Sequence, residues 1–91
     1  MYVRRLIWDD WNEDHIARHQ VDREDVEVVC RSSRSLGVRM RRGRYRVIGQ
    51  TGEGRYLAVI LDAVPNGGVY YAVTARNATD PERRRLLTWR R

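Results

Sequence analysis

The segment Arg55–Arg76, RYLAVILDAVPNGGVYYAVTAR, contains the strongest strand and turn signals in the chain. Residues 56–61 are almost wholly apolar, which suits a β-strand covered on both faces. The sequence PNGG at residues 65–68 favours a tight turn, and residues 69–75 are mainly β-branched or aromatic. We therefore predict a hairpin at the centre of an antiparallel sheet, with the remaining elements packed on it or paired beside it.

Shorter patterns upstream predict the rest of this sheet. Leu36, Val38 and Met40 alternate with other residues, and a turn at Arg42–Gly43 separates them from a further strand. Residues 2–8 form a predicted first strand. The four later strands, joined by short turns, are expected to form a consecutive antiparallel meander over residues 36–41, 44–50, 56–62 and 69–76.

Helix-capping patterns predict three helices, near residues 11–19, 22–31 and 80–89. Each begins with a capping residue followed three positions later by an acid, in the pairs Asp10 and Glu13, Asp22 and Asp25, and Thr79 and Glu82. We expect the last helix to turn its apolar side chains to the core: Leu86, Leu87 and Trp89. The predicted fold is one α+β domain over residues 1–91, of order β-α-α-β-β-β-β-α, with the helices packed on one face of the sheet.

The net charge of +6 is unevenly distributed along the 91 residues. All eighteen basic residues are arginine, which a GC-rich genome would also produce. Residues 1–30 hold four arginines and eight acids, a net charge of −4, whereas residues 31–91 hold fourteen arginines and four acids, a net charge of +10. A separate positive region suits a polyanion or an acidic protein partner.

The remaining composition argues against two other classes of protein. The single cysteine, Cys30, excludes an intramolecular disulfide framework, so we expect a reducing, cytoplasmic compartment. No apolar run approaches the ~18 residues of a membrane span, and no secretory signal pattern is visible, so no membrane association is expected.

Several short motifs, in this order and spacing, make the chain similar to the BrnT family of bacterial toxins. They are Trp8-Asp9 before a helix, His19-x-Val21, Val47-Ile48-Gly49, Gly54-Arg55-x-Leu57, and Thr74-Ala75-Arg76 before Glu82-Arg83. The resemblance covers nearly the whole chain. The chain departs from the family pattern in three ways. The residue after the histidine is usually glycine and here is Gln20, the first helix is a residue shorter, and the usual lysine positions hold other residues, among them Asn12 and Arg18.

The resemblance implies a RelE-like fold and a toxin of a type II toxin–antitoxin system. The toxin would be an endoribonuclease that cleaves mRNA, free or on the ribosome, and arrests translation. Its partner would be a co-encoded, BrnA-like antitoxin of the ribbon-helix-helix type, through which the complex would bind operator DNA and repress its own operon.

Metal-free RNA cleavage needs the 2′-OH to be deprotonated, the phosphorane charge to be stabilised and the 5′-oxygen to leave. Arginine stabilises charge with a bidentate fork but is a poor base. Arg76 ends a central strand, and simple alternation places it on the face of Thr74, Ala72 and Tyr70; the alternative is a surface arginine at a junction. Arg44 and Arg46 share one strand face, so both could reach one phosphate run, or they could belong to a solvated face.

Other candidates are weaker for stated reasons. The consecutive arginines Arg83, Arg84 and Arg85 fan over ~200° of a helix, so at most two can serve one site. Glu82 could be a catalytic acid, but its spacing favours a helix cap. Tyr70 could stack on a base, although a tyrosine in a sheet more often packs. The family motif also places Arg55 among the candidate RNA-binding residues.

His15 and His19 share a helix face, and His19 could act as a general base or be structural. A zinc site needs further ligands and Cys30 is isolated, so we expect no metal and no cofactor. Two functions from different classes remain. One is a metal-independent endoribonuclease toxin with Arg76, Arg46, His19 and Glu82 at its catalytic site. The other is a non-catalytic basic module that binds an acidic antitoxin or nucleic acid.

Overall fold

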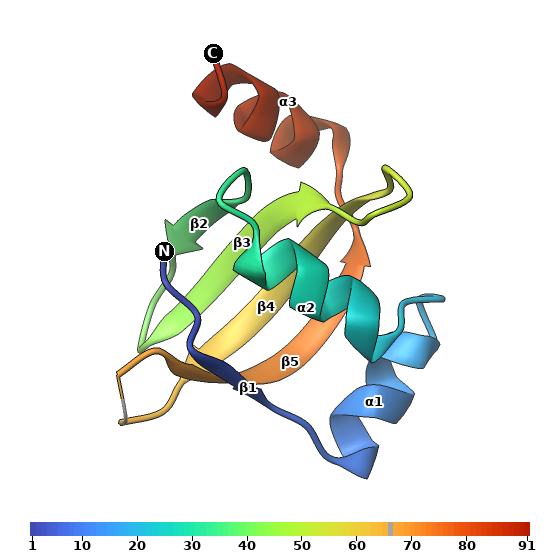
Figure 1. Cartoon of the computed structure of the whole chain (residues 1–91), viewed down its shortest axis with the longest axis vertical. Helices are drawn as coiled ribbons and strands as arrows, with labels where there is room; N and C mark the ends of the chain where they lie inside the picture. The colour runs from blue at the N-terminus through green and yellow to red at the C-terminus, as the bar shows by residue number, and fades with distance from the viewer. Residues whose placement is uncertain (66) are drawn as a thin grey trace.

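The computed structural model describes residues 1–65 and 67–91, and Asn66 of the predicted turn lies outside the described residues. This part of the chain forms one five-stranded sheet and three helices (Figure 1). The elements are β1 (Arg5–Ile7), α1 (Asp10–Ala17), α2 (Arg23–Arg31), β2 (Leu36–Arg39), β3 (Arg44–Gln50), β4 (Tyr56–Ala63), β5 (Val69–Asn77) and α3 (Asp80–Trp89). The predicted α+β class and element order are confirmed.

The strands lie in the order β1-β5-β4-β3-β2, so the β4–β5 hairpin is at the centre of the sheet. Strands β2 to β5 form the predicted antiparallel meander. β1 runs parallel to β5, with Leu6 opposite Tyr70, so the complete sheet is mixed. The sequence patterns predicted β1 but did not indicate its partner, because this pair is separated by more than sixty residues.

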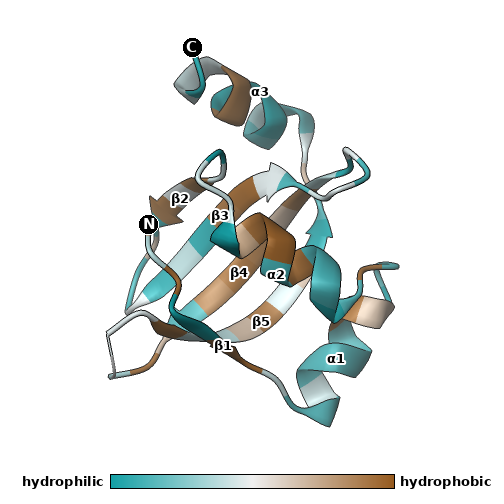
Figure 2. Ribbon diagram, in the orientation of Figure 1, coloured by the Kyte–Doolittle hydropathy of each residue, from teal (hydrophilic) through white to brown (hydrophobic). Residues whose placement is uncertain are grey.

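The main core lies between one face of the sheet and helices α1 and α2 (Figure 1). α2 buries Val26, Val29 and Cys30 at the predicted spacing of three and four residues. Figure 2 shows hydrophobic colour along α2 and along the strands that it covers. The sheet contributes alternate residues to this core, including Leu57, Val59 and Leu61 of β4 and others of β3 and β5.

α3 lies on the opposite face, so the prediction of three helices on one face is wrong. Its Glu82 binds Arg46 and Arg76, which alternate with the core residues Val47 and Ala75. Leu86 is fully buried but belongs to no part of the main core cluster. Leu87 and Trp89, also expected to face the core, are instead 40% and 49% exposed. A ten-residue helix with one strongly buried leucine covers only the end of this face.

A β-bulge in β5 overturns a second prediction. The register shifts between Ile60, opposite Thr74, and Leu61, opposite Ala72, so Val73 is an extra residue in β5. Arg76 therefore shares its face with Thr74, as predicted, but Ala72 and Tyr70 are turned to the core. One inserted residue reverses the faces of every residue beyond it, which strict alternation cannot anticipate.

The helix starts follow the predicted chemistry with one correction. Asp22 and Thr79 cap α2 and α3 with reciprocal capping boxes. α1 is capped by Asp9 with Asn12, not by Asp10 with Glu13. Asn12 is fully buried and also donates to the carbonyl of Ile7 at 2.9 Å, which ties the helix to β1.

The turn after α1 has a left-handed residue where the BrnT pattern has glycine. α1 ends at Ala17, two residues before the predicted end, and Gln20 has φ 59°. That conformation favours glycine, so Gln20 is a strained position in this turn. None of the helices in the described ranges is long and apolar enough to cross a membrane.

Candidate functional site

Three charged side chains from three elements meet on the sheet face that α3 partly covers. Glu82 of α3 accepts hydrogen bonds from Arg76 of β5, with Nη1 to Oε1 at 2.7 Å and Nη2 to Oε2 at 3.1 Å. Arg46 of β3 donates from Nη1 to Oε2 at 3.0 Å. We call Arg46, Arg76 and Glu82 the arginine–glutamate cluster.

Local sequence rules explain how these side chains come together. Arg46 and Arg76 occupy the same face of β3 and β5, on either side of β4, where Arg46 lies opposite Ile60 and Arg76 opposite Ala58. Glu82 is the third residue of α3, and its carboxylate accepts the backbone N–H of Thr79 at 2.9 Å. The capping box therefore fixes the carboxylate at the first turn, directly beside the end of β5.

The electrostatics of the cluster keep Glu82 ionised. Burial acts to raise its pKa, but hydrogen bonds from Arg76, from the Thr79 backbone and from Arg46 lower the pKa to about 2. The same hydrogen bond raises the pKa of Arg76. The capping geometry supports the stated alternative of a helix cap, and a catalytic role for the ionised Glu82 stays a prediction.

The cluster is buried at its centre and open at its edge. The Glu82 side chain is 7% exposed, whereas those of Arg46 and Arg76 are 28% and 36% exposed. Among the described residues, Arg46 Nε is a buried donor without a partner. Two guanidinium groups with a fixed orientation and access to solvent can bind an anion bidentately and stabilise charge that develops on it.

Arg44 lies on the same face as Arg46, as predicted. Its Nε and Nη2 donate to the two oxygens of Asp62 at 2.8 and 3.1 Å. Asp62 is opposite Arg44 on β4, a pairing that could not be recognised before the strand register was known. The positive charge of Arg44, on the same sheet face as the arginine–glutamate cluster, is thus partly neutralised by Asp62.

Of the helix arginines, Arg83 has a defined contact. Its guanidinium lies over the ring of Tyr56, 4.4 Å from the centroid. Tyr56 was predicted only as a strand residue, although its alternation with Ala58 places it on the face of the cluster. Arg84 and Arg85 are exposed, and neither side chain has a hydrogen bond, ion pair or cation–π contact within residues 1–65 and 67–91.

No protein-family model and no curated protein matches this chain. A search of solved structures found the Brucella abortus ribonuclease toxin BrnT, with 23% sequence identity and a TM-score of 0.66. The match covers 84% of this chain and 97% of that chain. The chain has the fold of BrnT. The family resemblance stated from the motifs is thereby confirmed at the level of the fold.

Within this BrnT fold, Arg55 holds the turn between α1 and α2. It donates to the backbone carbonyls of Gln20 and, at 2.8 Å, His19, and its Nε donates to Asn77 at 2.7 Å. These bonds use three of the five N–H donors of the guanidinium group. They stabilise the left-handed turn at Gln20 and give Arg55 a structural role, while its contact with RNA stays a prediction.

The other two aromatic or titratable candidates lie away from the cluster. The His19 ring contacts His15, which stacks on Trp11 at 4.9 Å, and no contact joins it to the arginine–glutamate cluster in the described part of the chain. Tyr70 packs against the main core and meets Tyr45 edge to face at 5.6 Å. The geometry of Tyr70 therefore supports packing in the fold, the alternative to stacking on a base. No group of three potential metal ligands occurs among the described residues.

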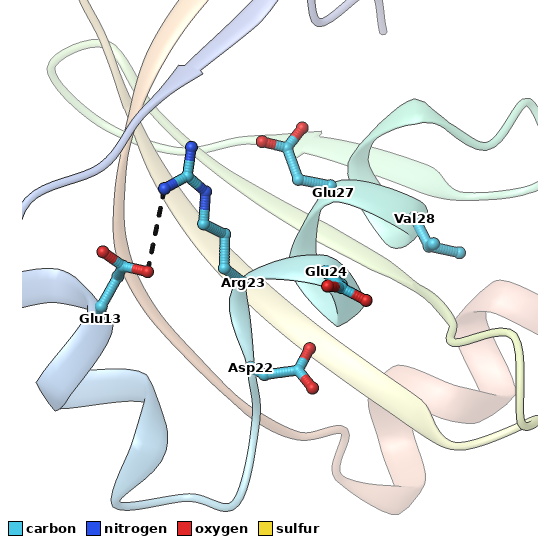
Figure 3. A pocket seen from close by; sticks show the side chains of 6 residues that line it. All are labelled: Glu13, Asp22, Arg23, Glu24, Glu27 and Val28. Carbon is cyan, nitrogen blue, oxygen red and sulfur yellow. Dashed lines mark ion pairs between the residues drawn. The ribbon is translucent and has the colours of Figure 1, made fainter.

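A pocket beside α1 and α2 is lined mainly by acidic residues, in contrast to the arginine–glutamate cluster. It has a volume of about 700 Å³ beside α1 and α2 and is lined by Glu13, Asp22, Arg23, Glu24, Glu27 and Val28 (Figure 3). Arg23 extends between the acids and lies 3.9 Å from Glu13 (Figure 3). We call this region the acidic pocket. All of its lining residues come from the negatively charged first third of the sequence.

Proposed function

We propose that the chain is an endoribonuclease toxin of a toxin–antitoxin system, with Arg46 and Arg76 at the site that binds the scissile phosphate. The observation that carries this proposal is the arginine–glutamate cluster, which presents two oriented cations on an open sheet face. The BrnT fold supports it, because the Brucella protein with this fold is a ribonuclease toxin.

In this proposal the arginines act by charge and position. Their guanidinium groups would hold the scissile phosphate and stabilise the charge of the phosphorane. Glu82, ionised and buried, orients both groups by accepting one or two hydrogen bonds from each. We assign His19 no part in proton transfer, because its side chain has no contact with the cluster; solvent water would accept the proton of the 2′-OH and supply one to the departing 5′-oxygen.

The proposed partner is a small ribbon-helix-helix antitoxin encoded by a neighbouring gene, through which the complex would bind operator DNA. The antitoxin would cover the sheet face that carries Arg46 and Arg76, and so inhibit cleavage of mRNA, whether free or on the ribosome. The exposure of Arg46 and Arg76 supports competition between antitoxin and RNA for one surface. Simultaneous binding of both without competition would contradict the shared surface.

The central test is cleavage of RNA by purified protein, together with growth arrest on expression. Arg76→Ala and Arg46→Ala should each lower the cleavage rate by about 10²- to 10³-fold, as loss of one charge-stabilising donor does. Arg23→Ala in the acidic pocket removes the same charge and should cleave as the unsubstituted protein does.

Because these substitutions remove a partner of buried Glu82, folding must be checked by circular dichroism. Arg76→Lys offers a second variant, since it keeps the charge but loses the planar fork. A folded Arg76→Ala protein that cleaves RNA at the normal rate would refute the proposed site.

One observation favours the alternative of a non-catalytic binding module. The Glu82 carboxylate already neutralises part of the charge of both arginines, and this pairing raises the pKa of Arg76 and lowers that of Glu82, so neither of these two groups readily exchanges a proton at neutral pH. If the folded protein binds RNA or an acidic antitoxin but neither cleaves RNA nor arrests growth, the binding module is the correct reading.

A further inference from the structure

The tip of the β2–β3 hairpin forms a basic pocket separate from the arginine–glutamate cluster. It has a volume of about 630 Å³ and is lined by Met40, Arg41, Arg42 and Arg44. Three of its four lining residues are therefore cationic, and the fourth is an apolar side chain that is 39% exposed. We call this region the hairpin pocket.

Most of its charge is unpaired. Arg44 is bound to Asp62, but Arg41 and Arg42 have no side-chain hydrogen bond or ion pair within residues 1–65 and 67–91. Some other arginines of the described chain pair with a nearby carboxylate, as Arg31 does with Glu27 at 3.0 Å. Two exposed, unpaired cations beside one concavity give a local positive potential that favours an anion.

The backbone gives a second and independent indication. Residues 41–44 form a turn closed by a hydrogen bond from Arg44 N–H to the Arg41 carbonyl at 3.1 Å. Its central residues both have positive φ, 58° at Arg42 and 73° at Gly43, as in a type I′ turn. Asparagine is preferred at the first of these positions, and a long side chain there is strained. The turn is therefore less stable with arginine at position 42 than with asparagine.

A strained residue with an unpaired charge beside a pocket suggests that the side chain has a role in binding. The position of the pocket indicates which ligand. Arg44 lines it and lies two residues from Arg46 on the same face of β3, about 7 Å along the strand. Arg44 thus connects the hairpin pocket to the face of β3 on which Arg46 of the arginine–glutamate cluster lies.

We propose that the hairpin pocket binds the phosphate backbone of single-stranded RNA, beside the segment held at Arg46 and Arg76. The inference deepens the proposed function by adding a subsite for RNA that flanks the scissile phosphate. Arg41 and Arg42 neutralise phosphates, and the exposed Met40 side chain contacts a nucleobase. Guanidinium planes also stack on unpaired bases, which makes single-stranded RNA a better match than an acidic peptide.

The test measures the affinity of a fluorescent, 2′-O-methylated RNA oligonucleotide by anisotropy over a range of salt concentrations. This RNA has no free 2′-OH and cannot be cleaved. The double variant Arg41→Gln/Arg42→Asn should reduce the log–log salt slope by roughly 1.4, since each phosphate contact on a single strand contributes about 0.7. Arg18→Gln is the control, because Arg18 is an exposed arginine at the end of α1, a helix that packs on the other face of the sheet from Arg44.

Arg42→Asn alone separates binding from folding. It should raise the midpoint of thermal unfolding by a few degrees, because asparagine relieves the strain, and should still weaken RNA binding. An unchanged RNA affinity in both variants would overturn the proposal. So would an equal loss in Arg18→Gln, or competition by poly-glutamate as effective as that by unlabelled RNA.

The outcomes also distinguish this subsite from the proposed nuclease. A protein that binds uncleavable RNA through the hairpin pocket but does not cleave ordinary RNA would contradict only the proposed function. A nuclease that cleaves through Arg76 but binds RNA equally well without Arg41 and Arg42 would contradict only the subsite.

Discussion

The arginine–glutamate cluster and the acidic pocket have inverted compositions. In the cluster, one carboxylate lies between two arginines, with distances of 2.7 to 3.1 Å and a Glu82 side chain that is 7% exposed. In the acidic pocket, one arginine lies among four acids, and the Arg23–Glu13 distance is 3.9 Å with side chains 54% and 42% exposed. The two regions therefore use the same residue types at very different interaction strengths.

This difference makes the arginine–glutamate cluster a better candidate for a catalytic site than the acidic pocket. A buried carboxylate with several donors fixes the orientation of its arginines, whereas a solvated pair remains free to move and is screened by salt. Glu27, which also lines the acidic pocket, accepts from Trp8 at 2.9 Å, a contact that joins the segment after β1 to α2, and from Arg31 of its own helix at 3.0 Å. The acidic region is held by such tertiary contacts, and its remaining acids lie in solvent.

Among the substitutions that test this difference, Glu82→Gln should have the largest effect on stability. The substitution keeps the size of the side chain and part of the helix cap but removes the charge that binds both arginines. We expect the free energy of unfolding to fall by about 2 to 3 kcal/mol, as charge-assisted hydrogen bonds are lost while the partly exposed arginines regain water. Urea denaturation measures the change. A loss below about 0.5 kcal/mol would mean that the cluster is no stronger than a surface pair.

Acid titration gives a second measure of the same interaction. Because the pKa of Glu82 in the folded protein lies below its ordinary value of 4.5, the carboxylate stabilises the fold fully above that pH. This stability should be lost as the pH falls through 4.5 toward about 2. The free energy of unfolding of Glu82→Gln should depend less on pH in this window. Parallel curves for the two proteins would contradict the lowered pKa.

Asn12→Ala tests the buried polar contact on the acidic side of the molecule. Asn12 caps α1 through Asp9 N–H at 2.9 Å and donates to Ile7. Its loss should cost about 1 to 2 kcal/mol, less than the loss of Glu82, because the hydrogen bonds involve a neutral side chain. Thermal unfolding measures this, and Asn12→Asp tests whether the amide donor to Ile7 is the important group.

The smallest effect is expected for Arg23→Ala. Its long contact with Glu13 lies in solvent, so the free energy of unfolding should change by less than about 0.5 kcal/mol. The Arg23 guanidinium also lies 5.6 Å from the Trp8 ring, a contact that is weak at an exposed site. A change comparable to that of Glu82→Gln would remove the distinction between the two regions.

Local signals in the sequence predicted most of the elements. The capping boxes at Asp22 and Thr79, the alternation in β3 and the apolar run of β4 each depend on neighbouring residues, so they could be recognised without the fold. The BrnT resemblance rested on the order of such motifs and agrees with the structural match.

What the sequence could not provide depends on long-range contacts. The parallel pairing of β1 with β5, the bulge at Val73 and the position of α3 are set by tertiary packing. The pairing of Arg46 with Glu82 spans 36 residues, and only the strand register and the capping box together bring them into contact. The Arg55 donors could not be assigned to the carbonyls of His19 and Gln20 before the position of that turn was known.

The separation of charge along the chain also affects how the protein meets other molecules. A protein with an acidic region around α1 and α2 and arginines on the other sheet face has a large electric dipole moment. In the field of a polyanion it would rotate during diffusion so that the arginine face leads the encounter. The rate of association with a polyanion should therefore fall steeply as added salt shortens the Debye length toward ~8 Å. A positively charged partner should instead approach the acidic region around α1 and α2.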